Sequence, residues 1–233
     1  MPLRPHQVDA TKAMFQHAKG QIIIPTGGGK TMCMIDDAEQ RFRSTIAKTV
    51  VVVAPRILLA EQLSSEFLEV LDDVSVMHVH SGETPHYSST NIWDIYSWHK
   101  KTEGNKIIFT TYHSLEKVKT STIDVDTIYF DEAHNSVQRN FFSAVKFFAT
   151  YRANRCFFFT ATPKHSTTIK KAGMNNSRVY GQVIVNVPAP KLVDEGYILP
   201  PKVEVYKSRL LRKDEIYADV ESEHMIGAID KLE

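Results

Sequence analysis

The sequence predicts an α/β domain built on a mostly parallel, doubly wound sheet with helices on both faces. Short apolar runs rich in Val, Ile and Phe alternate along the chain with longer segments of helical period. Continuous apolar runs of this length are typical of strands buried inside a parallel sheet. Regular alternation of such strands with helices favours the doubly wound class over an all-α or all-β fold.

Six apolar runs, each of seven residues or fewer, are the predicted strands. In chain order they are residues 21–25, 49–54, 74–80, 106–111, 126–131 and 155–160. Helices are predicted between them at residues 30–43, 58–71 and 141–151. In the second of these, Leu59, Leu63, Phe67 and Leu71 recur every four residues and form one apolar stripe.

Two segments interrupt the alternation. Residues 81–105 are largely polar and carry Trp93, Tyr96 and Trp98, so we expect a surface helix-loop whose aromatic rings dock on the body of the domain. After about residue 186, prolines and a glycine become frequent. We therefore predict one domain over residues 1–186 and, over 187–233, a linker with a strand at 202–206 and a weakly amphipathic helix near 214–232.

Composition sets limits on function. Of 233 residues, 42% are hydrophobic and 24% charged, as in ordinary folded domains, and 28 Lys and Arg against 27 Asp and Glu leave a net charge of +1. That balance excludes a histone-like, strongly basic mode of nucleic-acid binding but allows a local basic groove. No apolar run approaches the roughly 20 residues of a membrane span, and the N-terminus lacks the apolar core of a secretory signal. We expect a cytoplasmic or nuclear protein with no membrane partner, and both cysteines, Cys33 and Cys156, as small buried hydrophobes.

The strongest local motif predicts a phosphate-binding loop. Thr26, Gly27, Gly28 and Gly29 lie between a predicted strand and a predicted helix, and Lys30 and Thr31 follow them. Glycines let successive backbone N–H groups cradle phosphate oxygens, and the helix N-terminus adds its positive dipole end. Lys30 then meets the β- and γ-phosphates and the Thr31 hydroxyl binds Mg²⁺. Ile24 stands where the strict pattern has its first glycine, and the alternative is a glycine-rich turn that ends in a solvated lysine.

Two further motifs follow predicted strands. Asp131 and Glu132 end an apolar strand, at the sheet edge where open α/β sheets bind ligands. Asp131 can hold Mg²⁺ through water, and Glu132 can orient and deprotonate an attacking water; the alternative is an acidic helix cap. Thr160 and Thr162 follow another strand, and their hydroxyls can hydrogen-bond His134, although a plain strand-to-turn exit has the same sequence.

Taken together, these stretches resemble superfamily 2 helicases. Gly-Gly-Gly-Lys-Thr at 27–31, Asp-Glu-Ala-His at 131–134 and Thr-Ala-Thr at 160–162 are similar to motifs I, II and III, in that order. The Leu-Arg-Pro-His-Gln stretch at 3–7 resembles the adenine-reading segment, which assigns Arg4 and Gln7 to the nucleotide. Residues 54–56 and 110–115 resemble motifs Ia and Ib. Within superfamily 2, the sequence most resembles the DNA-directed subgroup that includes restriction motor subunits, UvrB-like proteins and phage DNA helicases.

The resemblance implies a RecA-like first motor domain that binds ATP and Mg²⁺ and hydrolyses ATP to move on nucleic acid. Glu132, Lys30 and Asp131 are then catalytic, and His134, Thr160 and Thr162 couple the two functions. Arg56, Thr111 and Ser114 are the expected nucleic-acid contacts, with a solvated arginine as the alternative for Arg56. Superfamily 2 motors have a second RecA-like domain. The residues after the domain are too few to form one, so we expect it as a partner in cis or in trans.

The motifs leave two other functions open. One is a superfamily 2 RNA helicase, because the core motifs do not choose between DNA and RNA. The other is a non-catalytic module that grips nucleic acid in response to nucleotide.

Overall fold

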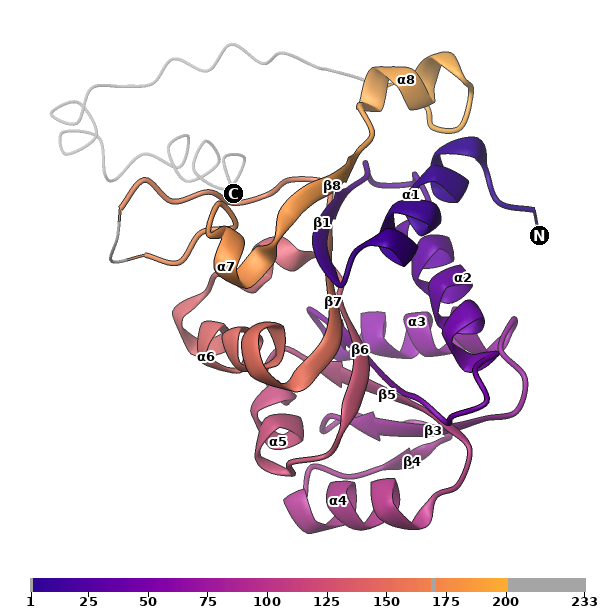
Figure 1. Cartoon of the computed structure of the whole chain (residues 1–233), viewed down its shortest axis with the longest axis vertical. Coiled ribbons are helices and arrows are strands. Elements are labelled where there is room, and N and C mark those ends of the chain that lie inside the picture. The colour runs from indigo at the N-terminus through magenta and orange to yellow at the C-terminus, as the bar shows by residue number, and fades with distance from the viewer. Residues whose placement is uncertain (1, 169–170, 201–233) are drawn as a thin grey trace, which may run out of the picture. The chain divides into compact units, whose positions relative to one another are not determined.

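The computed structural model describes residues 2–168 and 171–200, and its core is one sheet of parallel strands. Eight strands in this part of the chain run in the order β4-β3-β5-β2-β6-β7-β1-β8 (Figure 1). Their bounds are β1 Lys19–Ile23, β2 Thr49–Ala54, β3 Val74–Val79, β4 Tyr87–Ser88, β5 Asn105–Thr111, β6 Val125–Phe130, β7 Ala153–Thr160 and β8 Gln182–Asn186. The predicted parallel α/β class is confirmed.

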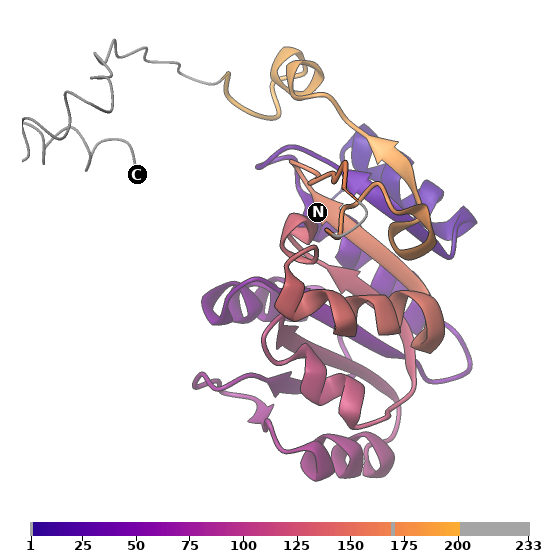
Figure 2. The ribbon, with the colours of Figure 1, turned by 90° about the vertical axis from the view of Figure 1, so that its left-hand side faces the viewer.

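Helices cover both faces of this sheet (Figures 1 and 2). The α-helices are α1 Pro5–Gln16, α2 Lys30–Phe42, α3 Ile57–Leu68, α4 Ile92–Lys101, α5 Leu115–Thr120, α6 Arg139–Phe147, α7 Ser177–Tyr180 and α8 Ala189–Asp194. A 3₁₀ turn spans Ala133–Asn135, and a π-helical turn, Phe148–Arg152, continues α6. The helices α1, α2 and α3 share one hydrophobic core with one face of the sheet, while α4, α5 and α6 share a second core with the other face.

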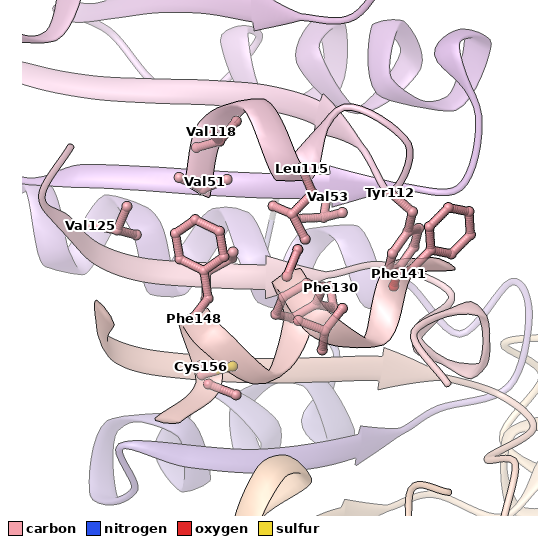
Figure 3. Close-up of a cluster of buried hydrophobic side chains, with 14 of the residues drawn as sticks. Val51, Val53, Tyr112, Leu115, Val118, Val125, Phe130, Phe141, Phe148 and Cys156 are labelled. Atoms are coloured by element: carbon pink, nitrogen blue, oxygen red, sulfur yellow. The ribbon is translucent and has the colours of Figure 1, made fainter. Parts of the chain in front are cut away.

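The central strands are continuous apolar runs because one hydrophobic core lies on each face of the sheet. Figure 3 shows Val51 and Val53 of β2 with Phe130 of β6, packed against Leu115 of α5 and Phe141 of α6. Intervening residues of the same strands, such as Val50 and Val52, face the first core. Because both faces are covered, each residue of β2 is buried.

The structure forms all six predicted strands, with ends that shift by no more than two residues. It adds elements that the apolar pattern of the sequence does not predict, chiefly α1 and β8. The residues that α1 buries include the polar His6, Gln7 and Thr11, so its apolar stripe is weak. The strand β8 lies at the edge of the sheet and is largely exposed, so it is not an apolar run.

The docking prediction for residues 81–105 holds for one tryptophan and is wrong for the other. Ile95 is the buried anchor of α4, and Trp98, one turn later, packs against the second core. Trp93 lies two residues before Ile95, on the outward side of the helix, and is 77% exposed.

Contacts with the first core continue past residue 186. Leu192 of α8 is fully buried, and Tyr197 and Ile198 pack against the same core, so the compact unit spans Met1–Leu199. The domain boundary at 186 stays a prediction, and the strand and helix predicted at 202–206 and 214–232 lie outside the described residues. Both cysteines are buried, as predicted. Within the described residues, no helix is long and apolar enough to cross a membrane.

Candidate nucleotide and nucleic-acid site

The predicted phosphate loop connects β1 directly to α2. Gly29 is the residue before the helix and has a φ of 82°, in the left-handed region that favours glycine. A Cβ on Gly28 would meet Pro25 O at 2.9 Å, so the loop also requires glycine on steric grounds. Ile24, which departs from the strict motif, is fully buried and donates its backbone N–H to Thr160 O at 3.1 Å. This departure therefore lies in the sheet core and leaves the glycine turn intact.

Three side chains near the start of α1 stabilise the loop by donating hydrogen bonds to three consecutive carbonyl oxygens. Arg4 Nη1 lies 3.4 Å from Gly27 O, His6 Nε2 lies 2.8 Å from Gly28 O, and Gln7 Nε2 lies 3.3 Å from Gly29 O. Gln7 Oε1 accepts the backbone N–H of Arg4 at 2.8 Å. Arg4 and Gln7 therefore lie beside the loop and also hydrogen-bond to its backbone. His6 was not predicted as a site residue; its position between Arg4 and Gln7 was the available signal.

The two predicted acids face the same loop. Lys30 Nζ lies 3.3 Å from Glu132 Oε1. Glu132 has a φ of 42°, which is uncommon for a residue with a side chain and turns the backbone away from β6. Asp131 is tied in place by its backbone, because its N–H donates to Val53 O at 2.9 Å and its O accepts the Tyr112 hydroxyl at 2.9 Å.

The electrostatics of the acids fit a bound cation. Burial, and then the negative charge of Glu132, raise the pKa of Asp131 to about 6, while Lys30 opposes the rise. A divalent cation would relieve this repulsion between carboxylates. Thr31, in the first turn of α2, adds a hydroxyl, and hydroxyl and carboxylate oxygens are the ligands that Mg²⁺ prefers. The residues present therefore fit Mg²⁺.

The last residue of β7 contacts His134, close to the acids, through its hydroxyl. Thr160 Oγ1 lies 3.2 Å from His134 Nδ1 and accepts the backbone N–H of Thr162 at 3.1 Å. His134 Nδ1 is also 3.4 Å from Glu132 Oε2. Burial lowers the pKa of His134 below its usual value, although Glu132 opposes this. Among the described residues, the Thr160 hydroxyl bonds to His134 and the Thr162 hydroxyl does not, so Thr162 takes part through its backbone. The other ring nitrogen of His134, Nε2, lies 3.3 Å from Asn135 Nδ2.

The three predicted nucleic-acid residues follow two adjacent strands. Arg56 comes after β2 and is exposed at the start of α3, and Thr111 and Ser114 come at and after the end of β5. The N–H of Tyr112 donates to Ala54 O at 3.1 Å, which keeps the two strand ends together. Thr111 is buried and its Oγ1 accepts the N–H of Ser114 at 3.3 Å, so its side chain shapes the turn. Arg56 and the half-buried Ser114 are the accessible members of the set.

A parallel sheet with a glycine loop after β1 and paired acids after β6, meeting at the same edge, defines a P-loop domain of the RecA-like class. Residues 1–165 match the family described as type III restriction enzyme, res subunit, and the chain belongs to that family. This confirms the resemblance to the N-terminal motor domain of superfamily 2 helicases.

Solved structures show the same fold at low sequence identity. A nuclease-deletion mutant of the Type ISP restriction-modification enzyme LlaGI, in complex with a DNA substrate mimic, has a TM-score of 0.71 at 20% identity over 100% of this chain and 24% of its own. The UvsW helicase from bacteriophage T4 has a TM-score of 0.56 at 15% identity over 78% and 60%. The Hef helicase domain from Pyrococcus furiosus has a TM-score of 0.55 at 23% identity over 78% and 37%.

The chain spans about a quarter of the length of the LlaGI deletion mutant in that structure. No curated protein sequence matches the chain. It is a helicase- and translocase-family domain of a kind found in ATP-dependent enzymes, and several of its structural neighbours are complexes with DNA.

Proposed function

We propose that this chain binds Mg²⁺-ATP at the loop between β1 and α2, and that it is the first motor domain of an ATP-driven DNA helicase or translocase. The observation that carries the proposal is the 3.3 Å contact between Lys30 Nζ and Glu132 Oε1. It joins the phosphate loop to the acids across the intervening strand β7.

Each residue has a role that its position supports. Lys30 leaves Glu132 for the β- and γ-phosphates when nucleotide binds, because phosphate is the stronger anionic partner. Thr31 and Asp131 hold Mg²⁺, which neutralises developing charge on the phosphates. Glu132, released from Lys30, orients and deprotonates the attacking water. Thr26 and the three glycines supply backbone N–H groups to the phosphates.

The path from nucleotide to nucleic acid passes through the Thr160–His134 contact and the ends of β2 and β5. Ser114 and Arg56 can bind backbone phosphates, which positions a strand without reading its sequence. We further propose that a second RecA-like domain, in cis or in trans, completes the catalytic site. An arginine finger supplied by such a neighbour contributes about 10³–10⁵ in rate. We therefore expect the 233-residue chain alone to hydrolyse ATP slowly or not measurably.

Calorimetric titration of Mg²⁺-ATP into Lys30→Ala tests the nucleotide site. We expect a sharp loss of affinity with an unchanged far-UV spectrum, because Lys30 supplies a charge and little core packing. Lys146→Ala, which removes an exposed lysine from α6, is the matched control and should bind as the wild type does. Equal ATP affinity in wild type and Lys30→Ala would contradict the assignment of the loop.

Fluorescence anisotropy with a labelled oligonucleotide across a salt series tests the nucleic-acid face. Arg56→Ala should weaken single-strand binding and lower the salt slope by roughly 0.7, the share of one phosphate contact. ATP affinity without nucleic acid should stay within about twofold. Parallel slopes for the two proteins would show that Arg56 is only solvated. Stronger binding to RNA than to DNA of the same sequence would favour an RNA helicase instead.

A further inference from the structure

Outside the nucleotide site, two histidines and a glutamate converge between β3 and α3. Glu61 lies on α3, His78 lies on β3, and His80 follows the end of β3. His78 Nδ1 is 2.9 Å from His80 Nε2 and 3.2 Å from Glu61 Oε1, and His80 Nε2 is 3.0 Å from Glu61 Oε1. The side chains of both histidines are fully buried, and that of Glu61 is 25% exposed.

Hydrogen bonds within the described part of the protein leave one of these three atoms, Glu61 Oε1, without a donor. The hydrogen bond from Gly82 N–H to His80 Nδ1, 3.2 Å long, places the proton of a neutral His80 on Nε2. That proton points to His78 Nδ1, which accepts it at 2.9 Å. Glu61 Oε1 is buried and has no hydrogen-bond partner among the described residues, although two ring nitrogens lie close to it. A buried carboxylate oxygen left in this way is costly unless a positive charge meets it.

The geometry of the triangle matches metal coordination. Metal–ligand bonds of about 2.0–2.1 Å at octahedral to tetrahedral angles set neighbouring ligand atoms roughly 2.9–3.4 Å apart. The three separations here, 2.9, 3.0 and 3.2 Å, lie in that interval, and the three atoms form a group that could hold one ion. Two imidazole nitrogens and one carboxylate oxygen are ligand types that a divalent metal accepts.

The surroundings of the histidines support the same role. His78 Nε2 lies 3.0 Å from Ser64 Oγ, so Nε2 can donate to that hydroxyl while Nδ1 keeps its lone pair for a metal. The ring of His86 stacks on His78 at 5.3 Å and covers it.

We propose that Glu61, His78 and His80 form a binding site for a divalent first-row transition metal, with Zn²⁺ as the representative ion. Nitrogen ligands favour such an ion over Mg²⁺ or Ca²⁺, which prefer oxygen. Binding moves the proton of His80 from Nε2 to Nδ1, and the contact from Gly82 N–H opens. The ion would tie β3 to α3, the helix that begins beside Arg56. The site is separate from the Mg²⁺ site proposed at Thr31 and Asp131 and does not depend on it.

Isothermal titration of Zn²⁺ into the tag-free, EDTA-treated chain tests the proposal, with Glu61→Gln as the main variant. Glutamine keeps the shape of the side chain and removes its charge, so the protein should fold. We expect one Zn²⁺ that binds the wild type at least tenfold more tightly than it binds Glu61→Gln. His80→Gln should lose the same binding. His165→Gln, which removes an exposed histidine elsewhere, should bind as the wild type does. Magnesium should bind this site far more weakly than Zn²⁺.

Thermal unfolding gives a second measurement on the same proteins. Without metal, wild type and Glu61→Gln should unfold at similar temperatures, and Zn²⁺ should raise the midpoint of the wild type alone. Zinc bound equally by wild type and Glu61→Gln would place the ion elsewhere, for example on Glu132 and His134, and would overturn the proposal. Absence of stoichiometric binding to the wild type, or tighter binding of Mg²⁺ than of Zn²⁺, would overturn it as well.

Discussion

Replacing Arg155 by methionine should be among the most destabilising single changes in this domain. Arg155 on β7 makes a bidentate ion pair with Asp37 on α2, with Nη1–Oδ2 and Nη2–Oδ1 both at 2.7 Å. The two side chains are only 10% and 4% exposed. Nη2 also donates to Met14 O at 2.9 Å, and the Tyr129 hydroxyl donates to Asp37 Oδ2 at 2.5 Å. One buried cluster therefore joins α1, α2, β6 and β7.

The magnitude follows from what the substitution leaves behind. Methionine fills most of the space but leaves Asp37 buried, with Tyr129 as its one remaining side-chain partner among the described residues. Loss of one member of a buried ion pair costs about 3–5 kcal/mol, because the remaining charge is uncompensated. The double variant Asp37→Leu, Arg155→Met removes both charges, although the Tyr129 hydroxyl and Met14 O lose partners at about 1–3 kcal/mol. It should therefore be more stable than Arg155→Met alone, by about 2 kcal/mol.

Urea unfolding followed by circular dichroism measures these differences. The matched control is Arg43→Met, because Arg43 pairs with Glu39 at 2.7 Å on the surface of the same helix region, with side chains 71% and 39% exposed. An exposed pair is worth about 0–1 kcal/mol, so the control should unfold near the wild-type midpoint. If Arg155→Met costs no more than Arg43→Met, or if the double variant is less stable than Arg155→Met, the reasoning about the uncompensated charge is wrong.

Three other predictions use contrasts within the chain. Gly29→Ala should weaken ATP binding and cost more than the about 1–2 kcal/mol of the left-handed φ, because its Cβ would also clash with Gln7 Nε2. Gly104→Ala, at a similar φ of 70° in open space, should cost only that amount and leave ATP affinity unchanged, as titration and urea unfolding can show. Burial lowers the pKa of His99 below its usual value of 6.5. The fold therefore favours the neutral imidazole, and the stability that this group contributes above pH 6.5 is lost as the pH falls. Unfolding midpoints measured at about pH 7.5 and 5.5 should differ less in His99→Gln than in wild type. Trp98→Ala should cost about 2 kcal/mol or more and Trp93→Ala less than about 0.5 kcal/mol in the same unfolding assay, because only Trp98 packs against the core.

The central sheet was predictable because burial on both faces leaves a continuous local pattern. The strand β2 is Thr-Val-Val-Val-Val-Ala and was predicted at its observed bounds. Edge elements leave no such pattern: β8 is exposed along much of its length, and β4 has only two residues. Trp93 shows a related limit, since an aromatic residue in a polar segment predicts contact with the core and only the phase of the helix decides whether contact forms.

The candidate nucleotide site was predictable where its residues are adjacent in sequence. The glycine loop and the pair Asp131 and Glu132 are short motifs whose local geometry follows from residue type. Contacts between residues far apart in the sequence produce no short motif that could be recognised. Glu61 stands 17 positions before His78, and Asp37 stands 118 positions before Arg155, so neither cluster forms a motif. They become visible only when the sheet brings β3 to α3 and β7 to α2.

Topology gives Thr160 a position that its short motif does not reveal. The strand β7 lies between β1, which leads to the phosphate loop, and β6, which leads to the acids. Thr160 ends β7; its backbone O accepts the N–H of Ile24, and its hydroxyl lies 3.2 Å from His134. Thr160 therefore contacts both the segment that leads into the phosphate loop and the histidine that follows the acids. A serine at this position would keep the hydroxyl, but it would lose the methyl group of a fully buried side chain.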